Sequence, residues 1–159
     1  MRLILALLML LPVPAIAAEW DHYENARFGY SIDVPPGFVA QPEADNGDGR
    51  VFRTPTASLT VFGSNIVEAD FEAAVRQRQA YAADDGWAIT YQATTPDKAS
   101  YSGKNGAHIL YARMIVLCGG TQFAMFELEY FAADLQKFDP VVSRLVPSLK
   151  ATNGSASCN

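Results

Sequence analysis

The order of hydrophobic periods along the chain restricts its fold more than any other feature. Apolar and polar residues first alternate in three segments, which is the period of half-buried β-strands: 27–34, 50–54 and 57–64. The period then becomes helical over residues 69–84, with Phe71 and Tyr81 on its apolar side. Gly86 is a natural C-terminal stop for this helix. The first half of the chain is therefore predicted as three strands and a helix.

The second half repeats this order without repeating the sequence. Three further segments have strand character: 87–94, 108–118 and 121–131. We interpret residues 96–100 as a connection and residues 103–106 as a turn. A second helix is predicted to begin with Asp139 as its N-cap and to end at Pro147. The order β-β-β-α-β-β-β-α predicts an α+β fold, an antiparallel sheet of about six strands with helices packed on it.

The N-terminus has the pattern of a secretory signal peptide. Arg2 precedes the apolar run 3–11, and Ala15-Ile16-Ala17 is a small-x-small cleavage site. We expect residues 1–17 to be removed, residues 18–150 to form a single domain and residues 151–159 to form a tail. No apolar run approaches the roughly 20 residues of a membrane span. The expected location is the periplasm, or outside the cell as a secreted protein.

The net charge limits which partners are possible, and the cysteine content indicates the redox state of the thiols. The formal net charge of −5 argues against nucleic acid or an anionic membrane as a partner, because phosphates favour basic surfaces. Cys118 and Cys158 are the two cysteines, and an isolated pair in an oxidising compartment favours a disulfide. Two free thiols are the alternative. Their spacing is too wide for a C-x-x-C redox pair.

A resemblance to known families begins at the first strand. The segment 27–38, RFGYSIDVPPGF, resembles the opening of PsbP-like and Mog-like sandwich domains, and the order of strands and helices is similar. The segment 46–52 resembles small exported bacterial proteins, mostly alphaproteobacterial, that have no assigned function. The resemblance implies an α/β sandwich and binding or assembly roles, like those of the photosystem oxygen-evolving subunit and the Ran-binding relative. It transfers no functional residue to this chain.

Candidate ligand-binding residues fall in two places. The loop around Asp45 and Asp48 suggests calcium, but an EF-hand frame would place Ala44 and Pro55 at two essential ligand positions. An ordinary turn is the favoured interpretation, and Arg50 beside it could hold a carboxylate or phosphate. Glu127 and Glu129 share a strand face, where paired carboxylates could share a proton or bind a cation. Solvated alternation explains the two glutamates equally well.

The sequence shows no coherent catalytic or metal-binding set. His22 and His108 are too few for a three-histidine zinc site, and no H-E-x-x-H, C-x-x-C or G-x-S-x-G motif occurs. No cofactor is implied. Tyr91, Tyr101 and Tyr111 line a ligand cleft in one interpretation; in the other they lie at the edge of the core with the hydroxyl in water.

Two function hypotheses follow. The first is a non-catalytic exported domain that binds a protein or small ligand, or that serves envelope assembly. The alternative is a periplasmic hydrolase whose site is assembled only in the fold, with His108 and Glu127 as its testable members.

Overall fold

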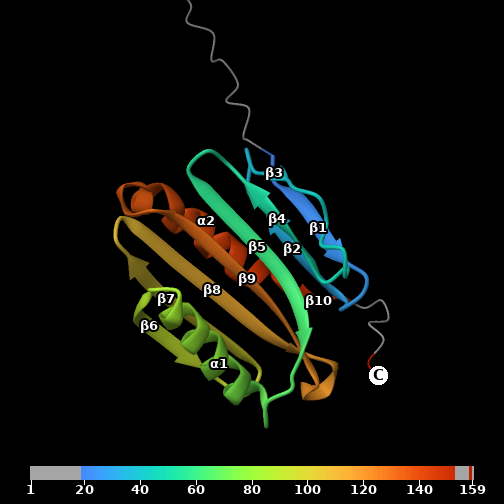
Figure 1. Cartoon of the computed structure of the whole chain (residues 1–159). Helices are drawn as coiled ribbons and strands as arrows, with labels where there is room; N and C mark the ends of the chain where they lie inside the picture. The colour runs from blue at the N-terminus through green and yellow to red at the C-terminus, as the bar shows by residue number, and fades with distance from the viewer. Residues whose placement is uncertain (1–18, 153–157, 159) are drawn as a thin grey trace, which may run out of the picture.

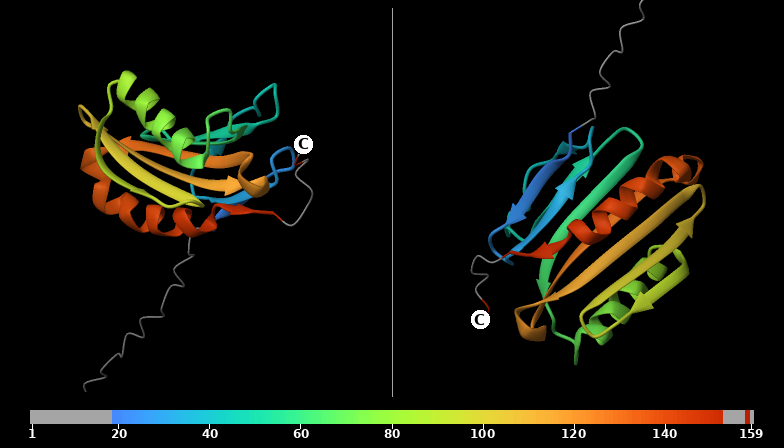
Figure 2. Two further views of the ribbon diagram at one scale, coloured as in Figure 1. Left: turned by 90° about the horizontal axis from the view of Figure 1, so that it is seen from below. Right: turned by 180° about the vertical axis from the view of Figure 1, so that it is seen from behind.

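The computed structural model describes residues 19–152 and 158, so the predicted signal peptide, 1–17, lies outside the described residues. The structure has a long antiparallel sheet with a helix on each face and a small sheet beside the second helix (Figures 1 and 2). The strands of the long sheet lie in the order β3-β4-β5-β9-β8-β7-β6. Their bounds in that order are Val39–Ala40, Gly49–Arg53, Ala57–Asn65, Gln122–Phe131, His108–Leu117, Lys98–Asn105 and Ala88–Thr94.

The second sheet has three strands in the order β1-β2-β10. They are Asp21–Asn25, Tyr30–Val34 and Lys150–Ala151, and the helices are α1, Phe71–Asp84, and α2, Leu135–Ser148. The predicted α+β class with an antiparallel sheet is confirmed. The expected count of about six strands is wrong, because the long sheet has seven strands.

Of the strands that the sequence pattern did not predict, β7 and β1 are the longest. Pro96 and Gly106 suggested a connection and a turn, and the small residues of β7 give little hydrophobic alternation. Tyr101 nevertheless is fully buried, and β7 pairs with both β6 and β8. In β1 one of the two buried residues, Asn25, is polar, and its side chain donates to the Gly47 carbonyl oxygen at 3.0 Å. A buried amide with its own partners leaves no hydrophobic signal in the sequence.

β9 lies inside the long sheet, between β5 and β8, and contributes side chains to two hydrophobic cores. Phe126 and Leu128 face the core beneath α2 and the small sheet. Phe123 and Met125 face the opposite core beneath α1. The alternate residues of β9 thus belong to two opposite faces, and both faces are covered by helices (Figure 2).

α1 has close to its predicted bounds. The Asp70 carboxylate caps it by accepting from the Ala73 N–H at 2.7 Å. Gly86 follows with φ +92°, a conformation that terminates helices. The placement of Tyr81 on the buried side is wrong, since its side chain is 52% exposed. It lies over an open pocket instead of the core.

α2 begins one turn earlier than predicted. It starts at Leu135, so Pro140 and Pro147 lie inside it, and Asp139 is not its N-cap. Phe138 in the added turn is buried and stacks on Tyr130 with ring centroids 4.4 Å apart. Burial of this ring favours extending the helix in front of Pro140.

The predicted disulfide is present. Cys118, in the turn between β8 and β9, is bonded to Cys158 of the tail. Among the residues that the structure describes, no helix is long and apolar enough to cross a membrane.

Candidate functional site

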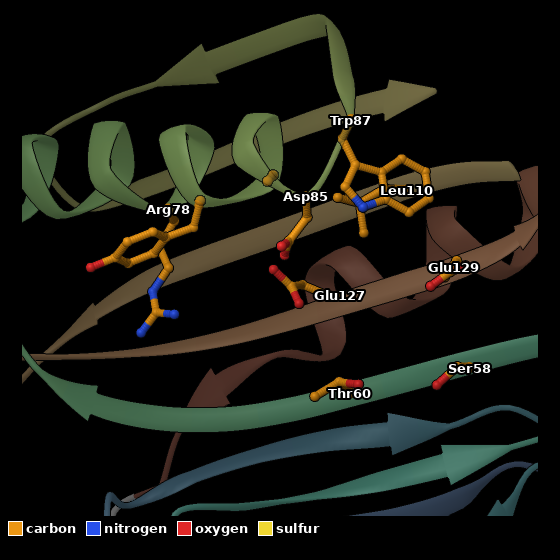
Figure 3. Close-up of a pocket in the computed structure, with 10 residues that line it drawn as sticks. Ser58, Thr60, Arg78, Asp85, Trp87, Leu110, Glu127 and Glu129 are labelled. Atoms are coloured by element: carbon orange, nitrogen blue, oxygen red, sulfur yellow. The ribbon is translucent and has the colours of Figure 1, made fainter. Parts of the chain in front are cut away.

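A pocket of about 280 Å³ lies between the C-terminal half of α1 and strands β5, β8 and β9 (Figure 3). We call it the α1 pocket. Its lining residues are Ser58, Thr60, Arg78, Tyr81, Ala82, Asp85, Trp87, Leu110, Glu127 and Glu129. It combines carboxylates, one arginine and two aromatic side chains, the composition of a site for a charged ligand.

Glu127 and Glu129 enter the pocket from β9. Glu127 pairs with Thr60 of β5 and Glu129 with Ser58, so both glutamates lie on the α1 face of the sheet. Glu127 is half-buried and Glu129 is exposed. The prediction that the two carboxylates share a strand face agrees with this register.

Asp85 brings a third carboxylate to the pocket from the end of α1. Its backbone N–H donates to the Tyr81 carbonyl oxygen at 3.0 Å, which fixes it as the C-terminal cap. The carboxylates of Asp85 and Glu127 point toward one another (Figure 3). The carbonyl end of a helix carries partial negative charge, and the last turn of α1 has no basic residue. Asp85 therefore adds a negative charge where the helix itself is already negative.

Burial raises the pKa of the Glu127 carboxyl above its ordinary value of 4.5, and the charges of Asp85 and Glu129 raise it further. The Arg78 guanidinium and the Tyr101 hydroxyl act in the opposite direction and lower this pKa. Glu127 is thus the group of the pocket with the least favourable environment for its negative charge.

Arg78 is held by aromatic rings rather than by an ion pair. Its guanidinium lies 4.9 Å from the ring centroid of Phe62, 5.3 Å from that of Phe123 and 5.8 Å from that of Tyr81. The two ion pairs among the described residues both involve Asp33 of β2. The carboxylates of the pocket therefore have no cation in direct contact within that part of the chain.

Tyr101 lies beneath the pocket. Its side chain is fully buried, and burial together with the nearby charge of Glu127 raises the pKa of the phenol. The hydroxyl approaches Glu127 but forms no hydrogen bond of normal geometry within the described chain. The hydroxyl thus lies beside the Glu127 carboxylate beneath the pocket and helps to stabilise its negative charge.

Glu127→Gln should stabilise the protein at neutral pH. Because the pKa of Glu127 is raised on folding, the folded protein binds this proton more tightly than the unfolded chain does. The stability that this tighter proton binding contributes is fully present below pH 4.5, and it is lost as the pH rises through the raised pKa of Glu127. The variant should therefore unfold at higher denaturant concentration than the wild type at pH 7, with little difference at acid pH. Glu129→Gln, at an exposed position, is the control, and an equal gain from it would contradict the assignment.

The other predicted ligand residues do not join this pocket. The Asp48 carboxylate accepts from the Asn46 amide at 2.7 Å, and the Tyr30 hydroxyl donates to the Asp48 carbonyl oxygen at 3.0 Å. The loop that contains Asp45 and Asp48 is thus a hydrogen-bonded turn. Within residues 19–152 and 158, no group of three or more His, Cys, Asp or Glu side chains could hold a metal ion.

Arg50 lies on the opposite face of the sheet from Glu127. It pairs with Val61, and its guanidinium lies 5.9 Å from the Tyr23 ring centroid. Its Nε is buried without a hydrogen bond in the described chain. Asp48 and Arg50 line a separate, more open cavity of about 300 Å³, so the five predicted ligand residues occupy two distinct places.

His108 and Glu127, the proposed members of a hydrolase site, are separated along β8. Glu127 pairs with Ala112, four positions from His108, a distance of about 13 Å along a strand. The His108 ring packs against that of Phe131 in a tilted arrangement, with ring centroids 4.5 Å apart. It lines a second pocket with Ser58 and Glu129, but no hydrogen bond joins these three side chains in the described part of the chain.

The three tyrosines considered as a cleft do not lie together. Tyr91 and Tyr111 each oppose Ser102 in the register of β6, β7 and β8, which places them on the α2 face of the sheet. Tyr101 lies on the α1 face, in the core beneath α1. Strand alternation therefore divides them between two faces.

Sequence reasoning missed Arg78, Asp85 and Trp87 as members of the pocket. One signal was available in Asp84-Asp85, because two acidic residues at a helix C-terminus are locally unfavourable. A residue that is unfavourable in its local structure, with no neighbouring residue to compensate for it, often marks a functional site. Arg78 gave no comparable signal, since polar residues on an amphipathic helix normally face solvent.

No protein-family model matches the chain, and neither does any curated protein. Solved structures do resemble it. A cyanobacterial PsbP, CyanoP from Synechocystis sp. PCC 6803, has 14% identity and a TM-score of 0.61 over 89% of this chain and 97% of its own. The Saccharomyces cerevisiae Ran-binding protein Mog1p has 12% identity and a TM-score of 0.60 over 85% of this chain and 96% of its own.

LpqN of Mycobacterium tuberculosis, a protein involved in cell envelope biogenesis, has 13% identity and a TM-score of 0.56. It is matched over 84% of this chain and 91% of its own. At these identities the likeness concerns the fold alone. The chain has a PsbP/Mog-like α+β fold, as the strand opening at residues 27–38 suggested.

Proposed function

We propose that this protein is a non-catalytic binding domain of the cell envelope that holds a cationic group of its ligand in the α1 pocket. The group is an ammonium or guanidinium, carried by a small molecule or by a basic side chain of a partner protein. The observation that carries the proposal is the convergence of Asp85, Glu127 and Glu129 at the negative end of α1. Of the three carboxylates, that of Glu127 is half-buried, and a carboxylate withdrawn from water is costly unless a cation pairs with it.

The walls of the pocket suit the same class of ligand. Tyr81 and Trp87 both line it, and aromatic faces attract cations through their electron-rich surfaces. The envelope location is supported by the disulfide, since such bonds persist in oxidising compartments. The involvement of LpqN, which has a similar fold, in cell envelope biogenesis is compatible with this location.

A fluorescence titration tests the pocket directly. The chain has two tryptophans, so a Trp20→Phe background leaves Trp87 as the reporter inside the pocket. We expect n-butylammonium and n-butylguanidinium to change the Trp87 emission in a saturable way, and n-butanol, which is neutral, to have no such effect. Glu127→Gln should weaken binding by about tenfold or more, because a charge-assisted contact is lost. Glu24→Gln, at an exposed position of β1, should leave the affinity unchanged.

Two results would contradict the proposal. An equal response to n-butanol would show an apolar rather than a cationic site. A response to butyrate alone would make Arg78 the anchor and the ligand an anion. If the cationic probes bind as expected, the natural ligand can be sought by native mass spectrometry of protein purified gently from its exporting host. It would be seen as an extra mass that denaturation removes.

A further inference from the structure

The outer edge of β6 differs from every other sheet edge in the described chain. β6, with sequence AITYQAT, is the last strand of the long sheet and pairs only with β7 (Figure 1). It contains no charged residue and no proline, and all its residues except Ile89 are exposed. Proteins normally blunt such edges with charges, prolines or very short strands, because unpaired backbone groups are a template for another strand.

The other edges carry these protections. β1, an edge of the small sheet, contains Asp21 and Glu24. β3 and β10, the remaining edges, have two residues each. β6 has one protective feature, a register irregularity between Ile89 and Tyr91, after which Tyr91–Thr94 pairs regularly with β7. The C-terminal half of β6 is therefore a regular, neutral and open edge.

α1 leaves room above this edge. A cavity of about 370 Å³ separates the helix from the C-terminal half of β6, and its lining residues are Glu72, Arg76, Gln79, Gln92 and Thr94. Residues 91–94 remain exposed beside this cavity, so the half-strand whose pairing is regular is accessible to a further strand.

We propose that β6 pairs with β6 of a second copy of this chain, antiparallel and with the two-fold axis close to Gln92, in the half of the strand whose pairing is regular. An antiparallel pair of identical strands satisfies two-fold symmetry, and a strand without charge brings no like charges together when it meets itself. The opposite edge of the long sheet, β3, is too short to continue the pairing. Association therefore closes at a dimer instead of extending into a fibre.

The test is the mass of the mature protein in solution across a wide range of concentration, by light scattering after size-exclusion chromatography. We expect the wild type to have twice the mass of one chain. Tyr91→Lys places two positive charges near the axis, and we expect the dissociation constant of the dimer to rise about tenfold or more. Tyr91 is 52% exposed, so this change should leave the thermal unfolding of the monomer nearly unchanged.

Two controls make the result specific to β6. Val67→Lys adds the same charge at an apolar position that is 88% exposed and outside the sheet, and should leave the dimer intact. Tyr91→Glu alone should also weaken the dimer, whereas an equimolar mixture with Tyr91→Lys should restore it, because the opposed charges then attract. A wild type that is monomeric at every concentration, or a dimer that tolerates Tyr91→Lys, would overturn the proposal. The monomeric result would leave a strand of another protein as the occupant of this edge.

Discussion

Gly49→Ala should cost about 3 kcal/mol of folding free energy, the upper part of the range for overpacked interiors. Gly49 opposes Phe62 where β4 and β5 pair, and a Cβ atom there would lie 2.0 Å from the Val61 carbonyl oxygen. It would also lie 2.7 Å from the Phe62 Cα. Both neighbours are backbone atoms of a paired strand, so a side-chain rotation cannot relieve the clash. A lower denaturant midpoint with an unchanged slope would record the effect.

Gly37→Ala is the matched control because it separates steric contact from backbone strain. Gly37 is exposed, has φ +82°, and a Cβ atom there would meet nothing within 4 Å. Its substitution should cost only the strain of the left-handed conformation, about 1–2 kcal/mol. If Gly49→Ala cost no more than Gly37→Ala, the close approach of β4 and β5 would not be the cause.

Removing the disulfide should have the second large effect. Cys118 and Cys158 close a loop with a sequence separation of 40, which in the chain-entropy model stabilises the fold by about 4 kcal/mol. The double variant Cys118→Ser/Cys158→Ser should therefore unfold about 10 °C below the oxidised wild type. The physical reason is the greater conformational freedom of the unfolded chain once the cross-link is gone.

Reductant supplies the control for this second prediction. It should lower the unfolding temperature of the wild type to that of the double variant, while the double variant itself should not respond. A double variant as stable as the oxidised wild type would show that the bridge only tethers the tail.

The architecture could be predicted from the sequence wherever a strand or helix shows its own hydrophobic period. β5 and β9 alternate over their whole length, and the observed register assigns Leu59 and Phe126 to one face and Glu127 to the other. β7 has no such signal, because its burial depends on pairing with β8 and on a helix that precedes it in the sequence. Tyr101 alone gives that strand a large buried side chain.

The candidate site could be predicted only in part for the same reason. Glu127 and Glu129 lie two positions apart on one strand, so local alternation relates them. Asp85 meets Glu127 because the end of α1 packs on the face of the sheet from which Glu127 projects, a relation set by tertiary packing (Figure 3). Arg78 is positioned by three aromatic rings from α1, β5 and β9, and no spacing in the sequence encodes that arrangement.

The two-sided burial of β9 has a consequence for how this chain can change over evolution. Because alternate residues of β9 belong to opposite cores, inserting or deleting one residue would exchange the two sets. Glu127 would then enter the hydrophobic layer beneath α2, and Phe126 would enter the α1 pocket. Point substitutions along β9 can be absorbed one at a time, but length changes cannot. Natural length variation in relatives of this protein should therefore gather in the segments between strands and leave the β9 segment constant in length.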